Sequence, residues 1–229
     1  MKTIYTWGDS HVSMFDETYR DESWAPKPEG ERKVVFHERS HCAVYTAYNI
    51  ENRLDELRSH LSKIDYKEQD EIWFMFGEID VRFHIFYHHQ RLKMPLDKMI
   101  DLVTKKYTTS VNLLRQEGYN AFIVSVVPPQ RSPGPHLYDP VYATKELDGS
   151  NAYIRGEGNT LKDRIYITEE FNRQVEIKCK ELSIGFRNIH PLIVDPETRC
   201  NILWMTRDGM HYNYLGDILI KAFHLDEGV

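Results

Sequence analysis

The sequence WGDSH, residues 7–11, follows a short run of alternating residues that is typical of a β-strand. The run stops at Gly8, and an acid, a hydroxyl and an imidazole come directly after it. A serine becomes a nucleophile only when a base removes its proton and a further group orients that base. Two hypotheses are therefore open for Ser10: it belongs to an ordinary polar turn, or it is a nucleophile at the end of a strand.

A base and an orienting acid stand together near the other end of the chain. Asp208 and His211 are three residues apart, which lets the carboxylate reach one imidazole nitrogen while the other nitrogen points into a site. Gly8 permits a tight turn, and a serine just beyond it at a helix start has a free N–H that can face a developing oxyanion. The two motifs supply the parts of a Ser-His-Asp triad.

A third polar motif, FGEIDVR at residues 76–82, ends an apolar run. Glu78 and Arg82 are four residues apart, so either they form an intrahelical ion pair or Arg82 acts in the site. Three nearby histidines lack a carboxylate or cysteine at a metal-binding spacing, so no metal is predicted. They are His84, His88 and His89.

The ordered set Gly-Asp-Ser, Gly-x-x-Asp and Asp-x-x-His resembles the SGNH (GDSL-type) hydrolase family over nearly the whole chain. The resemblance implies that Ser10 is the nucleophile, His211 the general base and Asp208 the residue that orients it. In that family the oxyanion donors are the N–H of the nucleophile, a backbone N–H after the second strand and an Asn side chain. The GEID-x-R variant resembles a branch found among bacterial glycan-modifying and polysaccharide-locus proteins.

Two positions depart from the family pattern. Ala43 stands where the family has glycine, and alanine retains the backbone N–H. Ile79 stands where the family has its Asn, and isoleucine has no side-chain donor. Arg82 is the candidate substitute. The full set of candidate oxyanion or substrate-binding residues is Ala43, Gly77, Arg82, Asp9, His11 and Glu78. Within it, Asp9 is expected to support the turn, and His11 is either a turn residue or a substrate contact.

Strand patterns alternate with helical patterns along the chain, which predicts a three-layer α/β/α fold with a mainly parallel sheet of about five strands, SGNH- or flavodoxin-like. Because parallel strands end at one edge, the motifs are expected to converge there. The predicted strands are 3–7, 33–37, 71–76, 121–127 and 186–190, and the predicted helices are 47–62, 96–117, 169–182 after Thr168 as N-cap, and 214–223. We expect one domain over residues 1–229, with residues 128–162 as a long loop inserted over the active face.

Composition narrows the possible partners. The formal net charge of −6 disfavours nucleic acid as a partner. The three cysteines are Cys42, Cys179 and Cys200, and their wide spacing indicates neither a disulfide framework nor a zinc site. No secretory signal or bilayer-spanning run is present, so a cytoplasmic location without a membrane span is expected.

The sequence predicts a serine esterase that needs no cofactor, acting on a small-molecule or glycan ester, foremost an O-acetyl group on a carbohydrate. A carbohydrate O-acetyltransferase of polysaccharide biosynthesis is the alternative within enzymes. The alternative from another class is a non-catalytic glycan-binding or scaffold domain, which the missing Asn motivates.

Overall fold

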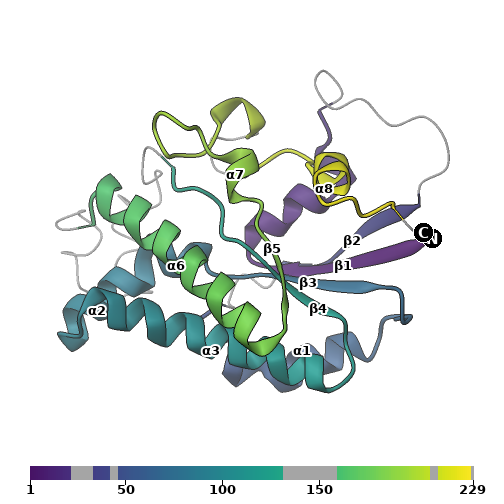
Figure 1. Ribbon diagram of the computed structural model, residues 1–229, viewed down its shortest axis with the longest axis horizontal. Coiled ribbons are helices and arrows are strands. Elements are labelled where there is room, and N and C mark those ends of the chain that lie inside the picture. The colour runs from purple at the N-terminus through teal and green to yellow at the C-terminus, as the bar shows by residue number, and fades with distance from the viewer. Residues whose placement is uncertain (22–32, 42–45, 131–158, 207–210, 228–229) are drawn as a thin grey trace.

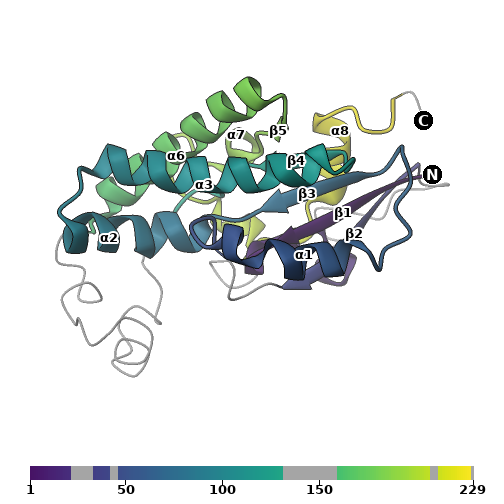
Figure 2. The same cartoon turned by 90° about the horizontal axis from the view of Figure 1, so that it is seen from below.

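The computed structural model describes residues 1–21, 33–41, 46–130, 159–206 and 211–227. Within these residues five strands form one sheet in the order β2-β1-β3-β4-β5, and every neighbouring pair is parallel. Helices lie on both faces (Figure 1, Figure 2), so the predicted three-layer α/β/α architecture is confirmed. The strands are β1 (Lys2–Gly8), β2 (Val34–His41), β3 (Glu71–Met75), β4 (Ala121–Val124) and β5 (Gly185–Arg187).

Two groups of helices cover the sheet, one on each face (Figure 1). The first group is α1 (Leu54–Leu61), α2 (Ile85–Leu92), α3 (Leu96–Gln116) and α6 (Leu161–Leu182). The second group is the 3-10 helix η1 (Ser10–Phe15), α7 (His190–Ile193) and α8 (Gly216–Ala222). Shorter turns of helix connect them: η2 (Glu17–Tyr19), η3 (Ile50–Arg53), the π-helix η4 (Asp80–His84) and η6 (Leu203–Met205).

Each face of the sheet has its own hydrophobic core, because side chains alternate along every strand. In β3, Ile72 and Phe74 belong to the core shared with α1, α2, α3 and α6. Trp73 and Met75 belong to the core shared with η1, α7 and α8. All four side chains are at most 2% exposed, as the nearly continuous apolar sequence of this central strand predicts.

Two helix boundaries differ from the sequence expectation. Helix α6 begins at Leu161 instead of residue 169, because the Thr160 hydroxyl caps Asp163 N and the Asp163 carboxylate caps Thr160 N in return. Thr168, the predicted N-cap, lies inside this helix and is completely buried. Residues 47–62 form η3 followed by α1, so the single helix predicted there was wrong. Of the predicted loop 128–162, residues 131–158 lie outside the described part.

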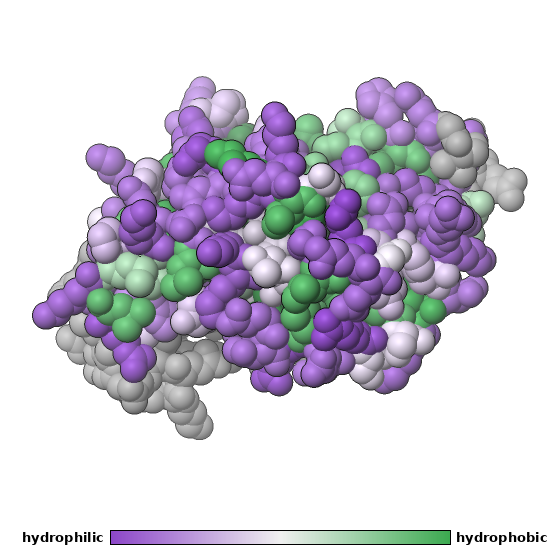
Figure 3. All heavy atoms as spheres, turned by 60° about the horizontal axis from the view of Figure 1, so that its bottom comes forward, coloured by the Kyte–Doolittle hydropathy of each residue, from purple (hydrophilic) through white to green (hydrophobic). Residues whose placement is uncertain are grey.

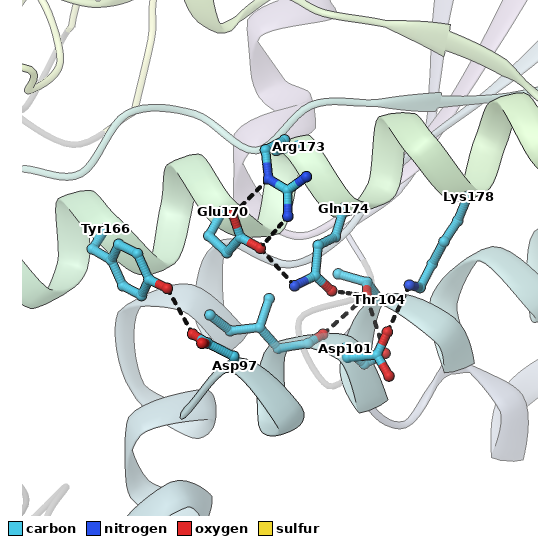
Figure 4. A network of polar contacts seen from close by, with 9 residues as sticks. Asp97, Asp101, Thr104, Tyr166, Glu170, Arg173, Gln174 and Lys178 are labelled. Atoms are coloured by element: carbon cyan, nitrogen blue, oxygen red, sulfur yellow. Dashed lines mark hydrogen bonds and ion pairs between the residues drawn. The ribbon is translucent and has the colours of Figure 1, made fainter. Parts of the chain in front are cut away.

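Helices α3 and α6 lie side by side and are joined by a row of polar contacts (Figure 4). The Tyr166 hydroxyl donates to Asp97 Oδ1 at 2.6 Å, and Lys178 Nζ donates to Asp101 Oδ1 at 2.7 Å. The Lys178 ammonium lowers the pKa of the Asp101 carboxyl through this bond. Exposed pairs of this kind contribute little each, so the apolar side chains beneath them supply most of the stabilisation of the interface.

The surface over the first group of helices is largely hydrophilic, with small and separate hydrophobic patches (Figure 3). Exposed apolar side chains such as Leu92, at 52%, and Leu113, at 38%, are scattered, as is usual for a folded domain. Among the described helices, none combines the length and the apolar character that a bilayer crossing requires.

Tyr107 fastens α3 to the end of β3. Its side chain is completely buried, and its hydroxyl donates to the Phe74 carbonyl at 2.9 Å and accepts from Phe76 N at 3.1 Å. Burial raises the pKa of Tyr107 well above its ordinary value, so the hydroxyl keeps the proton that it donates. Because Phe76 directly precedes Gly77 and Glu78, this hydroxyl helps to set where the GEID segment leaves the sheet.

Replacing Tyr107 by Phe should lower the free energy of unfolding by about 2 kcal/mol, because one buried donor and one buried acceptor lose their partner. Urea unfolding followed by circular dichroism measures the change. Tyr119→Phe is the matched control: its ring packs against Tyr66, its hydroxyl bonds to no described residue, and we expect a change below about 0.5 kcal/mol. Equal losses in the two variants would show that the Tyr107 hydroxyl does not fasten α3.

Candidate active site

The carboxyl ends of β1 and β3 form the edge at which two of the polar motifs meet. The chain passes from β1 to β2 on one side and then to β3 on the other, so the strand order reverses between β1 and β3. Parallel sheets bind ligands at such a switch point. Asp9 and Ser10 follow β1 directly, and Gly77 and Glu78 follow shortly after β3. The convergence expected from the strand pattern is therefore present.

Gly8 is required by a close approach of two strands. A Cβ at this position would lie 2.1 Å from the carbonyl oxygen of Met75, so any side chain would push β1 and β3 apart. The Asp9 N–H donates to that same oxygen at 3.1 Å and extends the contact between the strands by one residue. Ser10 then begins η1, and no described residue accepts from its backbone N–H.

Ser10 and His211 meet although they are 201 residues apart in sequence. His211 Nε2 lies 3.0 Å from Ser10 Oγ, a hydrogen-bonding distance. A hydroxyl and an imidazole at this distance satisfy the first geometric condition for general-base activation of a serine. The contact lies at the carboxyl edge of the sheet, where the sequence expectation located it.

The segment after His211 is tied to the helices that follow Ser10. Tyr214 N donates to the Tyr19 carbonyl at 3.0 Å, and Leu215 N donates to the Met14 carbonyl at 2.8 Å. These bonds hold the approach to α8 against η1 and η2. They explain how a residue near the end of the sequence is held over the first strand.

Asp9 and His11 form a buried pair beside Ser10. Each residue is 2% exposed, and Asp9 Oδ1 lies 3.1 Å from both His11 N and His11 Nδ1. The other carboxylate oxygen, Oδ2, accepts from Glu78 N at 3.3 Å. Asp9 therefore caps η1 and links the ends of β1 and β3, which agrees with the turn-supporting role expected for it.

The protonation of this pair follows from its surroundings. Burial lowers the pKa of His11, but the hydrogen bond to Asp9 and the charges of Glu78 and Asp9 outweigh burial, so the pKa lies above its ordinary value of 6.5. Burial raises the pKa of Asp9, but the bonds and charge of His11 outweigh that effect, and the pKa lies below 3.8. Between pH 3.8 and pH 6.5 the pair is therefore mainly an imidazolium and a carboxylate.

The segment from Gly77 to Arg82 follows β3 and lies beside the segment that follows β1. Gly77 has φ of +124°, and a Cβ there would lie 2.9 Å from side-chain atoms of Phe171 and Val126, so glycine is required. Arg82 Nε lies 2.8 Å from Glu78 Oε1, which is the ion pair that the four-residue spacing predicted. A role for Arg82 or Glu78 toward an oxyanion stays a prediction.

Asp80 is a residue to which the sequence analysis gave no role. It is completely buried, and its Oδ2 accepts from Ala47 N at 2.7 Å. This bond ties the chain beyond β2 to the end of β3. Asp80 is visible in the sequence as the last residue of GEID, but the residue to which it bonds is 33 residues away. Ala43 and Asp208 lie outside the described residues, so their predicted roles stay predictions.

A small cavity borders Glu78 and Arg82. Its polar wall includes Gln130 and Arg164, and Arg164 is only 5% exposed. Asn159 Nδ2, at the end of the predicted loop, donates to the Arg82 carbonyl at 2.8 Å. The described ends of the loop 128–162 therefore lie close to the GEID segment. The full lining is Glu78, Val81, Arg82, Val127, Pro128, Pro129, Gln130, Arg164 and Thr168.

The fold has relatives among solved structures, although no known sequence family and no curated protein matches this chain. A GDSL-like lipase from Bacteroides thetaiotaomicron is similar with 15% identity and a TM-score of 0.58, over 100% of this chain and 89% of that one. A candidate acylhydrolase from Bacteroides fragilis is similar with 11% identity and a TM-score of 0.54, over 96% and 83%. At these identities the likeness shows a shared fold, and activity has to be argued from the site.

Replacing Asp9 by Asn should lower the free energy of unfolding by about 3 kcal/mol at pH 5, because a buried ion pair loses its acid. The difference from the wild type should be largest between pH 3.8 and pH 6.5, the ordinary pKa values of the two groups. It should shrink as the pH rises through the raised pKa of His11, and also as the pH falls through the lowered pKa of Asp9. Urea unfolding from pH 3 to pH 9 measures both limbs.

Asp16→Asn is the control for this experiment. Asp16 caps η2 through Thr18 N and contacts no histidine in the described part of the chain. Asn also caps well, so its effect should be small at every pH. A loss in Asp9→Asn that does not change with pH would contradict the charged pair.

Proposed function

We propose that this protein is a serine-dependent ester hydrolase that works through a covalent acyl-enzyme. The observation that carries the proposal is the distance of 3.0 Å between Ser10 Oγ and His211 Nε2 at the switch point of the sheet. The shared fold with a lipase and a candidate acylhydrolase supports it by analogy.

In the proposed reaction, Ser10 Oγ attacks the carbonyl carbon of an ester while His211 Nε2 takes the hydroxyl proton. The tetrahedral intermediate collapses when the bond to the leaving alkoxide breaks, and His211 returns the proton to that oxygen. Water then attacks the acyl-serine with His211 again as base, and Ser10 leaves with a proton. Asp208 is the proposed orienting acid, and the cycle uses no metal or organic cofactor.

The oxyanion of the intermediate needs donors that are already in place. We propose the backbone N–H groups of Ser10 and Ala43, because the Ser10 N–H has no acceptor among the described residues. The Ile79 side chain has no donor to add. Arg82 is paired with Glu78 and stays the candidate side-chain donor that the sequence suggested.

The substrate that we propose is an O-acetyl ester on a carbohydrate, acted on in the cytoplasm. Its support is the resemblance of GEID-x-R to glycan-modifying and polysaccharide-locus proteins. Transfer of the acetyl group to a sugar hydroxyl instead of water uses the same acyl-enzyme. Incubation of an acetylated donor with an unacetylated oligosaccharide separates the two, since only a transferase yields the acetylated acceptor in preference to free acetate.

A fluorophosphonate probe should label the wild-type protein at Ser10, because the probe reacts only with an activated serine. Ser10→Ala should abolish labelling, and both Ser10→Ala and His211→Ala should lower kcat for 4-nitrophenyl acetate by at least about 1000-fold. Peptide mass spectrometry identifies the labelled serine, and absorbance follows turnover.

Two surface variants control for nonspecific effects. Ser62→Ala and His224→Ala change the same residue types at exposed positions and should retain wild-type turnover. Absence of both labelling at Ser10 and turnover would refute the hydrolase and favour a non-catalytic binding domain. Wild-type turnover in folded His211→Ala would refute His211 as the base.

A further inference from the structure

His11 occupies a position for which a turn-supporting role gives no reason. Its imidazole lies against that of His211, with 5.3 Å between ring centroids and 38° between the ring planes. His211 in turn contacts Ser10, the residue directly before His11. The ring therefore packs against the proposed base, next to the proposed nucleophile, and His11 is only 2% exposed.

The hydrogen bonds of His11 fix which ring nitrogen remains for chemistry. Nδ1 is held by Asp9 Oδ1 at 3.1 Å, and the backbone N–H is held by the same oxygen. Nε2 lies on the opposite side of the ring and has no hydrogen-bond partner among the described residues. An imidazole anchored at one nitrogen presents the other in a fixed direction.

The carboxylates around the ring favour its imidazolium form, against the effect of burial. The His11 ring is bonded to Asp9. Glu78 and Arg82 face the ring from the segment after β3, and His211 faces it from the segment before α8. The two carboxylates favour the imidazolium and Arg82 disfavours it, with a net shift toward the protonated form. A cation held in a dry site by fixed partners stabilises a negative charge more strongly than the same cation in water.

We propose that His11 is a further oxyanion-stabilising residue, whose Nε2–H donates to the carbonyl oxygen of the ester that Ser10 attacks. The inference rests on the proposed hydrolase function and adds a side-chain donor to the backbone N–H of Ser10. Histidine side chains are among the groups that form oxyanion holes in acyl transfer. The role of Asp9 is then to position this donor and to hold it in the protonated form.

The protonation state gives this donor a pH signature. A neutral His11 that keeps its Nδ1–H on Asp9 has a bare Nε2, which accepts and does not donate. We therefore expect kcat to fall as the pH rises through the pKa of His11, which lies above 6.5. A general base acts only in its unprotonated form, so kcat should also be low in acid.

The experiment compares His11→Gln with His11→Asn in the full-length protein. The Gln amide nitrogen reaches the position of Nε2, whereas the Asn amide nitrogen reaches only the position of Nδ1 and keeps the bond to Asp9. We expect kcat of His11→Asn to fall by at least about 100-fold with KM nearly unchanged, and kcat of His11→Gln to stay within about tenfold of the wild type. His11→Gln should also lose the alkaline fall in kcat, because an amide does not titrate.

Stability serves as the second measurement, because a structural role predicts the opposite order. His11→Asn retains the Asp9 contact and should be at least as stable to urea as His11→Gln. Activity that follows stability, with Asn better than Gln, overturns the proposal. Wild-type kcat in His11→Asn also overturns the proposal. A 100-fold loss of kcat in Arg82→Ala without a loss in either His11 variant would assign the donor to Arg82.

The fluorophosphonate reaction separates failure of this inference from failure of the hydrolase function. Phosphonylation also develops negative charge on an oxygen, so the rate of labelling should fall in His11→Asn in step with kcat. If the wild type is labelled at Ser10 and His11→Asn is labelled at the same rate, the inference alone is overturned. Absence of labelling and turnover in the wild type overturns both.

Discussion

The carboxylate of Asp9 is the constraint on which the rest of the site depends. Its two oxygens accept from His11 N and from Glu78 N, and one of them also holds the His11 ring. Because the group is buried, water cannot replace any of these partners, and each bond has to be made inside the protein. One side chain therefore joins the ends of β1 and β3 and sets the direction in which η1 begins.

The sheet supplies a rigid edge, and buried polar bonds connect the outlying segments to it. The Tyr107 hydroxyl bridges two backbone groups at the end of β3, and Asp80 holds Ala47 N beside it. On the other face, the approach to α8 is bonded to the carbonyls of Met14 and Tyr19. The bonds of Tyr107 and Asp80 satisfy buried polar groups, so the same bonds stabilise the fold and position the candidate chemistry.

The charges near Ser10 alternate in sign. The Asp9 carboxylate lies beside the His11 imidazole, and the Glu78 carboxylate lies beside the Arg82 guanidinium. Paired charges can remain ionised in a buried setting, whereas a single charge would be neutralised by a shift of its pKa. The edge thus holds an imidazole and a guanidinium, each paired with a carboxylate.

Local patterns in the sequence determined much of this molecule. The apolar runs at 71–76 and 121–127 and the periodicity after Leu96 predicted strands and a helix that the structure contains, and their alternation predicted the parallel sheet. Since parallel strands end at one edge, the order of the motifs also indicated where Ser10 would lie. These features follow from neighbours in the sequence, so a pattern of a few residues is enough to reveal them.

Only the tertiary structure decided which groups touch and in which protonation state. The approach of His211 to Ser10, the bond from Asp80 to Ala47 and the packing of His11 on His211 join residues that no local pattern connects. The raised pKa of His11 depends on burial and on charges from separate segments. Such contacts depend on how whole elements pack, because distance and burial are properties of the folded chain and periodicity is a property of the sequence.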